Sequence, residues 1–213
     1  MSRSTLSLAG AILIALAAAG PAPAQQPDPD RAARLMDDLM WGRGHVGGPF
    51  ELVDQTGKTR TDADFRGKLM IVYFGYTYCP DICPTDLMQI GLAVDKLGAA
   101  GEDVQPLFIS VDPGRDTPEV LAQYVAMFHR RLIGLTGTPE QIRAVADSYK
   151  AYYAKYSPPD GAVYLIDHTG FVYLIGRSGE YLGFFPPGTS ADRMVEIIRQ
   201  HLVSSNSPAP AGQ

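Results

Sequence analysis

The stretch LMIVYFG at residues 69–75, followed at once by YTYCPDICP at residues 76–84, carries the strongest fold signal of the chain. An apolar run of strand length without alternation is typical of a central strand that is covered on both faces. Cys79 and Cys83, the two cysteines of the chain, follow this strand where it gives way to a helix. Their spacing predicts that both sulfurs lie on one helical face, with Cys79 at the helix N-terminus, where a thiolate is favoured. Two such thiolates are both a redox couple and a soft set of metal ligands.

Strand and helix patterns alternate on both sides of this segment. Upstream, we expect a short helix at residues 30–41 and a hairpin of residues 50–53 and 59–61. Downstream, the patterns predict helices at 85–97, from 117, at 138–149 and at 190–202, strands at 104–111 and 132–135, and a hairpin of 171–175 and 180–184. This order predicts an α/β fold with a central mixed sheet, helices on both faces and an extra N-terminal hairpin; a thioredoxin-like core fits it best.

The two ends of the chain differ in composition from its centre. Residues 1–24 contain Arg3 and an apolar stretch, residues 6–19, which is shorter than the roughly 20 residues that span a bilayer. We therefore expect a cleaved signal peptide, with an uncleaved anchor as the alternative, and an exported, periplasmic protein. Residues 25–48 are then a lead-in segment, residues 49–203 the folded domain, and the Ser/Pro/Ala-rich residues 204–213 a disordered tail.

Composition and charge exclude several classes of protein. A chain of 213 residues that is 46% hydrophobic can bury one proper core, and its formal net charge of −5 gives no basic surface for nucleic acid. Two cysteines in an exported protein are ordinarily one structural disulfide. A disulfide between residues only four apart restrains the unfolded chain little and would add little stability. The pair therefore favours a chemical role over a structural one.

Three separated motifs resemble the signatures of the Sco/SenC family: YFGYTYCPDICP at 73–84, SVDPGRDTPE at 110–119 and DHT at 167–169. The resemblance covers residues 49–202, and three motifs in the right order are far more specific than a lone cysteine pair. It implies a thioredoxin-fold copper protein that helps to assemble the dinuclear copper centre of cytochrome c oxidase. It also implies that the copper ligands are Cys79, Cys83 and His168.

The chemistry of these side chains agrees with that implication. Copper(I) prefers thiolates and accepts imidazole, and a three-coordinate ion stays open to an incoming ligand, as transfer requires. We expect His168 in a loop just before the strand that starts at Phe171, beside the cysteine helix. For Asp112, the resemblance suggests a carboxylate that tunes metal binding or thiol basicity, whereas strand termination before Pro113 is an equal alternative.

Other residues of the motifs are assigned structural roles. Asp116 is expected to be a cap or an ion-pair partner of Arg115, and Met88 a core residue. Many family members carry His immediately before the first cysteine, where this chain has Tyr78. The aromatic residues Phe74, Tyr76 and Tyr78 are expected to surround the cysteine pair and shield the cuprous state.

Two functions remain open at this point. The first is a periplasmic metallochaperone that delivers copper to, or reduces the cysteines of, the copper-accepting subunit of cytochrome c oxidase. The second is a thiol:disulfide oxidoreductase acting on exported proteins, although its ordinary motif has two residues between the cysteines and this chain has three. Contact with other periplasmic copper or thiol proteins is compatible with both, and membrane contact is expected only through an uncleaved N-terminal segment.

Overall fold

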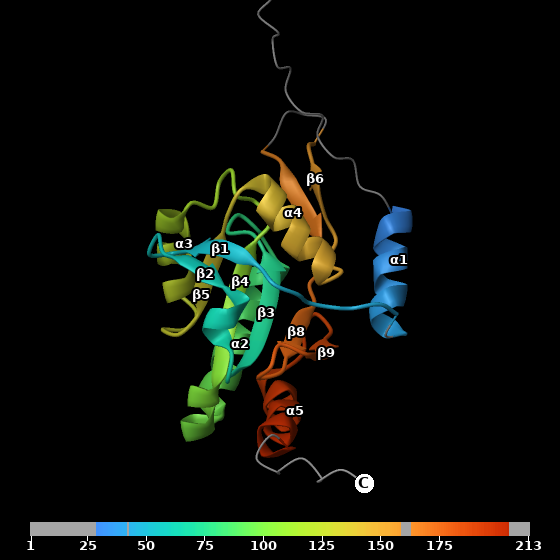
Figure 1. Ribbon diagram of the computed structural model, residues 1–213. Coiled ribbons are helices and arrows are strands. Elements are labelled where there is room, and N and C mark those ends of the chain that lie inside the picture. The colour runs from blue at the N-terminus through green and yellow to red at the C-terminus, as the bar shows by residue number, and fades with distance from the viewer. Residues whose placement is uncertain (1–28, 42, 159–162, 205–213) are drawn as a thin grey trace, which may run out of the picture.

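The computed structural model describes residues 29–41, 43–158 and 163–204. Its centre is a seven-stranded mixed sheet in the order β2-β1-β5-β4-β3-β8-β9 (Figure 1). The strands of this sheet are β1 (Glu51–Asp54), β2 (Thr59–Thr61), β3 (Leu69–Gly75), β4 (Val104–Ser110), β5 (Ile133–Thr136), β8 (Val172–Ile175) and β9 (Tyr181–Phe185). Strands β3, β4 and β5 are parallel to one another, while β1, β8 and β9 each run antiparallel to a neighbour. The prediction of a mixed sheet with an N-terminal hairpin, β1–β2, at its edge is confirmed.

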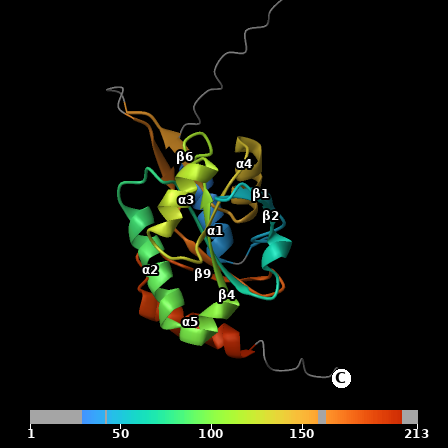
Figure 2. The same ribbon diagram turned by 90° about the vertical axis from the view of Figure 1, so that its left-hand side faces the viewer.

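Helices cover both faces of this sheet, as predicted (Figures 1 and 2). The described helices are α1 (Pro29–Met40), α2 (Ile82–Lys96), α3 (Pro118–Ala126), α4 (Pro139–Ser148) and α5 (Ala191–Ser204), with short 3-10 helices at Asp62–Phe65 and Gly98–Asp103. A Cβ on Gly134 of β5 would contact Leu121 of α3, and α2 packs against α5. On the opposite face, the ring of Phe74 in β3 contacts Tyr149 at the end of α4. The chain therefore has the thioredoxin-like architecture, in which a strand at the centre of the sheet leads into the cysteine segment.

The central strand β3 is buried along its whole length, in agreement with its unalternating apolar sequence. It pairs with β4 from Leu69↔Val104 to Gly75↔Ser110, so the two strands end at the same edge of the sheet. Because the carboxyl ends of parallel strands meet there, the segments that follow β3 and β4 lie side by side. This register places the cysteine motif beside the Asp112 motif.

A second, two-stranded sheet was not predicted from the sequence. Strands β6 (Tyr153–Tyr156) and β7 (Leu165–His168) form an antiparallel pair outside the main sheet. Each strand has four residues, and the stretch that joins them contains Pro158 and Pro159, so the alternation that reveals a strand is too short to be detected. Among the described residues, no helix is long and apolar enough to cross a membrane.

A buried carboxylate holds the β1–β2 turn together. Asp54 accepts hydrogen bonds from the backbone and hydroxyl of Thr56 at 2.8 and 2.5 Å, from the Lys58 backbone at 3.1 Å, and from Arg60 Nε at 2.7 Å. Burial by itself would raise the pKa of Asp54, but the hydrogen bonds from Thr56 and Arg60 outweigh it and lower the pKa to about 2. A depressed folded-state pKa means that this stabilisation is complete above the unfolded-state pKa of about 4 and is lost as the pH falls toward 2.

We therefore expect Asp54→Ala to lower the free energy of unfolding by about 2 kcal/mol at neutral pH. The difference between wild type and variant should narrow between about pH 4 and pH 2, because the wild-type carboxylate is protonated in that range. Urea unfolding of both proteins across this range measures the difference, and Asp192→Ala, which removes an exposed carboxylate, is the control. A difference that does not change with pH would contradict this account of Asp54.

Candidate metal centre

The cysteine segment leaves β3 as a turn before it becomes a helix. β3 ends at Gly75 and α2 begins at Ile82, so Cys83 lies in the first helical turn and Cys79 precedes the helix. The prediction that both sulfurs lie on one helical face was wrong. Proline at position 80 disfavours helical backbone at the residue before it, which keeps Cys79 out of the helix.

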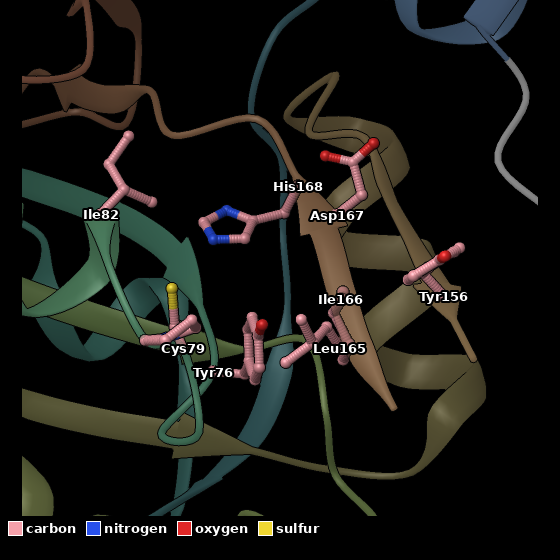
Figure 3. A pocket seen from close by; sticks show the side chains of 9 residues that line it. Tyr76, Cys79, Ile82, Tyr156, Leu165, Ile166, Asp167 and His168 are labelled. Atoms are coloured by element: carbon pink, nitrogen blue, oxygen red, sulfur yellow. The ribbon is translucent and has the colours of Figure 1, made fainter. Parts of the chain in front are cut away.

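His168 closes the site from the other sheet. It is the last residue of β7, where it pairs with Tyr153, and not a loop residue as predicted. Its Nε2 atom lies 3.2 Å from the sulfur of Cys83, and the ligand atoms of Cys79, Cys83 and His168 all lie within 4.8 Å of one another. Figure 3 shows the sulfur of Cys79 pointing toward the imidazole ring, whereas Asp167 points away.

The imidazole is oriented by its neighbours. Nδ1 of His168 lies 3.3 Å from the carbonyl oxygen of Thr169. This contact holds one ring nitrogen and turns the other, Nε2, toward the sulfurs. The rings of Tyr73 and Tyr76 meet the imidazole edge-on, with centroids 6.3 and 5.9 Å away. Such support for the second ring nitrogen is the usual arrangement around a metal-binding histidine.

The two thiols differ in exposure and in proton affinity. Cys79 is half-buried and Cys83 is fully buried, and both are free thiols in this structure. A hydrogen bond from Cys83, assisted by one from His168, outweighs burial and lowers the pKa of Cys79 to about 3. The same shared proton, together with burial, raises the pKa of Cys83. The two opposite shifts come from one hydrogen bond between the thiols, and they favour the thiolate at Cys79 and the protonated thiol at Cys83.

This asymmetry predicts selective alkylation of the metal-free, reduced protein. Iodoacetamide should modify Cys79 rapidly at pH 6, where an ordinary cysteine of pKa about 8.5 reacts slowly because little of it is thiolate. The rate should stay high until the pH approaches the lowered pKa of Cys79. Mass spectrometry after timed alkylation measures the rate at each site. Cys83→Ala removes the hydrogen-bond donor and should shift the reactivity of Cys79 toward higher pH; an unchanged pH profile would contradict the shared proton.

Glycine at position 75 makes room for the buried sulfur. A Cβ atom on Gly75 would lie 2.8 Å from the sulfur of Cys83 and 3.0 Å from the ring of Phe108. A Cβ atom essentially never lies as close as 2.8 Å to another heavy atom, so any side chain at this position would displace the sulfur of Cys83 and crowd the ring of Phe108. The last residue of β3 thus fixes how deeply Cys83 can sit.

Asp86 and Tyr73 lie beneath the cysteines and were not identified from the sequence. The carboxylate of Asp86 is fully buried, and it accepts hydrogen bonds from the Tyr73 hydroxyl at 3.3 Å and from the Gly188 backbone at 2.9 Å. Burial raises the pKa of Asp86. Its position three residues after Cys83 on the same helix is a signal that could have placed it on the cysteine side of α2.

Asp112 is close to the site but is not one of the three side chains whose ligand atoms converge. Its buried carboxylate accepts a hydrogen bond from the Tyr164 hydroxyl at 2.8 Å and from Nε of Arg115, and Lys155 Nζ lies 3.8 Å away. The guanidinium of Arg115 lies 3.7 Å from the centroid of the Tyr164 ring and donates to the Tyr164 carbonyl oxygen at 3.0 Å. Since Lys155 belongs to β6 and Tyr164 directly precedes β7, Asp112 fastens the hairpin that carries His168.

The prediction that Phe74, Tyr76 and Tyr78 surround the cysteine pair was partly wrong. Tyr76 is buried beside His168, but Tyr78 is 55% exposed and Phe74 packs on the opposite face of the sheet. Successive strand residues point to opposite faces, so Tyr73 takes the place that was assigned to Phe74. Met88 was expected in the core and is 56% exposed.

A cleft of about 430 Å³ opens next to the cysteine turn. Its lining is mostly apolar: Tyr76, Cys79, Pro80, Ile82, Tyr156, Leu165, Ile166, Asp167 and His168. Two of the three converging side chains, Cys79 and His168, therefore face a space that an incoming molecule can enter (Figure 3).

Comparison with known proteins gives consistent results. The SCO1/SenC family model matches residues 40–203. The SCO2-like protein of Rickettsia prowazekii is 46% identical over 155 residues, which cover 72% of this chain and 76% of that protein. The crystal structure of Arabidopsis thaliana ScoI with copper bound is 42% identical and has a TM-score of 0.71, covering 75% of this chain and 99% of that one.

A more distant structure matches as well. BsSco, described as a member of the Sco family of cytochrome c oxidase assembly proteins with a disulfide switch, is 25% identical and has a TM-score of 0.60. The match covers 75% of this chain and 94% of that one. With a family model that spans most of the described residues, and relatives and solved structures that agree with it, this chain belongs to the SCO1/SenC family.

Proposed function

We propose that this protein is an exported copper metallochaperone for cytochrome c oxidase, and that Cys79, Cys83 and His168 hold the copper. The observation that carries the proposal is the convergence of two sulfurs and one imidazole nitrogen within 4.8 Å. Thiolate and imidazole are the ligands that copper(I) prefers among protein side chains. The copper-bound structure of a 42% identical relative supports copper as the metal.

The protonation of the site suits the binding of a cation. Cys79 is already a thiolate in the metal-free protein, so copper binding needs to displace the proton of Cys83 alone. His168 already presents Nε2 toward the sulfurs. The three ligands therefore need little rearrangement to bind the metal.

Because Cys79 and His168 line the cleft, the site is open to an incoming protein that could take the copper. Three protein ligands leave a copper ion accessible, and the cleft beside Cys79 and His168 lets ligands of another protein reach it. Exchange can then proceed one ligand at a time, with Cys79 and His168 reachable first and buried Cys83 last. The naming of BsSco as a cytochrome c oxidase assembly protein supports the copper-accepting subunit of that oxidase as the receiver.

The location and the domain limits belong to the same proposal. Residues 1–24 would direct export to the periplasm, whether they are then removed or kept as a tether, and they lie outside the described residues. Residues 25–48, which include α1, would form a lead-in to the domain of residues 49–203. The disordered tail proposed for residues 204–213 lies outside the described residues, except that Ser204 ends α5.

Copper transfer tests the proposal directly. The purified protein, without residues 1–24, should bind one copper(I) ion and pass it to the soluble copper-accepting domain of the oxidase, separated afterwards by ion exchange and analysed for metal. Copper that stays with this chain while the acceptor remains empty would contradict a chaperone role.

A thiol:disulfide oxidoreductase is the second candidate, because a half-buried thiolate beside a fully buried thiol is the arrangement such enzymes use. In that reaction, Cys79 and Cys83 would give two electrons to a disulfide of the partner, and the two partner sulfurs would take one proton from Cys83 and one from solvent. Cys79 and Cys83 would themselves become a disulfide. The disulfide switch described for BsSco is consistent with such chemistry.

His168→Ala separates the two candidates. Loss of one of three ligands should lower copper(I) affinity by at least about a hundredfold, the upper end of what even supporting residues cost. Dithiol exchange with a glutathione disulfide substrate does not need the imidazole as a ligand and should persist. Competition with a chromogenic chelator measures the affinity, and His45→Ala, which truncates an exposed histidine, is the control. Unchanged copper affinity in His168→Ala would remove the histidine from the site.

A further inference from the structure

The carboxylate of Asp116 lies at the junction of β4 and α3 and has no exposed surface. The sequence suggested a cap or an ion pair with Arg115. Among the described residues, however, Asp116 takes part in no ion pair, and Nε of Arg115 donates to Asp112 instead. Asp116 accepts three hydrogen bonds: from the Thr77 backbone at 3.0 Å, from the Thr77 hydroxyl at 2.6 Å and from the Ser110 hydroxyl at 2.5 Å.

Thr77 belongs to the turn that presents Cys79. The backbone N–H of Cys79 donates to the carbonyl oxygen of Tyr76 at 3.2 Å, which closes the turn around Thr77 and Tyr78. The segment between the end of β3 and the start of α2 has neither a strand ladder nor a helix to fix it. Both donors of Thr77 go to one carboxylate, so Asp116 anchors this turn to the body of the protein.

The anchor is itself rigidly held. Ser110, the last residue of β4, donates its hydroxyl to Asp116 and accepts the backbone N–H of Asp112 at 3.0 Å. The backbone N–H of Asp116 donates to the Asp112 carbonyl oxygen at 2.9 Å. A fully buried carboxylate with these partners cannot move without leaving a polar group unsatisfied, which is unfavourable in the interior of a protein.

We infer that Asp116 is a positioning residue for Cys79: through Thr77 it fixes the turn that holds the sulfur of Cys79 next to the sulfur of Cys83 and Nε2 of His168. For copper binding, this inference rests on the proposed function; for the approach of the two sulfurs, it stands on the geometry alone. Asp116 would touch neither the metal nor the thiols. It would set how closely the two sulfurs approach each other. That distance in turn sets how readily they form a disulfide and how tightly they bind copper(I).

The three hydrogen bonds allow positioning to be separated from charge. In Asp116→Asn, the amide oxygen can accept from the Thr77 backbone and from Ser110, while the amide N–H donates to the Thr77 hydroxyl oxygen. This variant keeps the contacts and loses the charge. Asp116→Ala loses both, and Thr77→Val removes the hydroxyl contact alone, which Thr77→Ser restores.

The test measures the approach of the sulfurs without metal and the copper affinity separately. In a glutathione redox buffer, the equilibrium between the Cys79–Cys83 dithiol and its disulfide reports the effective concentration of one thiol at the other. Asp116→Ala should lower that effective concentration about tenfold and weaken copper(I) binding by about ten- to a hundredfold, as loss of a supporting residue does. Thr77→Val should change both quantities in the same direction, whereas Asp116→Asn and Thr77→Ser should stay within about twofold of wild type.

Asp54→Ala is the matched control. Asp54 is also a buried carboxylate that binds the backbone and hydroxyl of a threonine, Thr56, but it lies in the β1–β2 hairpin, outside the metal centre. Its loss should lower the melting temperature as Asp116→Ala does and leave the disulfide equilibrium and copper affinity at wild-type values.

Four outcomes decide the inference. If Asp116→Ala has a lowered melting temperature but a wild-type disulfide equilibrium and wild-type copper(I) affinity, the inference is overturned. If Asp116→Ala does not fold, wild-type values in Thr77→Val would overturn it equally. Impairment of Asp116→Asn as severe as that of Asp116→Ala would assign the effect to charge and also overturn it. If wild type binds no copper but Asp116→Ala still shifts the disulfide equilibrium, the proposed function fails and the positioning role stands.

Discussion

Cys83→Ser is expected to abolish the retention of copper(I), lowering the affinity by well over the roughly hundredfold that loss of a supporting residue can cost. Cys83 supplies the fully buried sulfur of the cysteine pair, 3.2 Å from Nε2 of His168. A serine hydroxyl is nearly the same size, so the packing around Gly75 and Phe108 should survive. It is a hard, weakly acidic ligand, which copper(I) does not favour. Copper content after gel filtration, and chelator competition for affinity, measure the effect.

Cys79→Ser is the parallel variant and should lower copper(I) affinity as much as Cys83→Ser does, but for a different physical reason. Cys79 is the thiolate of the pair, so its replacement removes the negative charge that attracts the cation. Circular dichroism and melting temperature should stay close to wild type in both variants, because the thiols are free and no bridge is lost. Copper affinity at the wild-type level in both variants would rule out the Cys79, Cys83 and His168 site.

Asp112→Ala is expected to have the largest effect on stability, lowering the free energy of unfolding by about 3 kcal/mol. The substitution leaves the guanidinium of Arg115, which is mostly buried, without its carboxylate, and leaves the hydroxyl of Tyr164 without its acceptor. Leaving one partner of a buried ion pair uncompensated costs more than the pair itself contributes. Urea unfolding measures the loss.

The same substitution should weaken copper binding without touching a ligand. Asp112 ties Lys155 and Tyr164 of the β6–β7 hairpin to the edge of the main sheet, and His168 is the last residue of that hairpin. A loosened hairpin should lower copper(I) affinity by about tenfold, within the range for residues that support a ligand. The double variant Asp112→Ala with Arg115→Met should recover part of the stability, because the unpaired charge is gone, but not the copper affinity.

An exposed ion pair is the control for this prediction. Asp192→Ala removes the pair with Lys96, both of which are largely exposed, and should cost less than about 1 kcal/mol. If Asp112→Ala lost stability while copper affinity remained at the wild-type value, Asp112 would be a core residue and would have no part in holding His168.

The sequence predicted the main sheet well because its signals are local. The apolar run of residues 69–75 has no alternation and became the fully buried β3 with the predicted limits. Thr138, followed by Pro139 and Glu140, predicted the start of a helix, and the hydroxyl of Thr138 does accept the backbone N–H of Gln141 at the start of α4. Each of these patterns is read within one or two turns of chain, where propensity and capping act.

Predictions failed where contacts distant in sequence decide the structure. Exposure of Met88 depends on which face of α2 the sheet covers, and helical spacing alone does not determine that face. The strands β6 and β7 each have only four residues and are stabilised by pairing with each other and by Asp112. Two of the three hydrogen bonds that the Asp116 carboxylate accepts come from Thr77, 39 positions earlier. No pattern in the neighbouring residues distinguishes such a partner from a helix cap.

The amino-acid pattern alone was enough to place the elements of the main sheet, the two cysteines at the end of the central strand, and the residues that the family resemblance names. Two features of the site needed the packed structure: Cys83 is the buried thiol, and a second hairpin brings His168 across 85 positions to within 3.2 Å of its sulfur. The physical reason is that residue identity fixes which atoms could bind a metal, whereas burial, shared protons and distances exist only after the chain has packed. A local pattern reflects the backbone preferences of neighbouring residues. It carries no information about the contact between the turn after β3 and a hairpin that begins some 70 residues later.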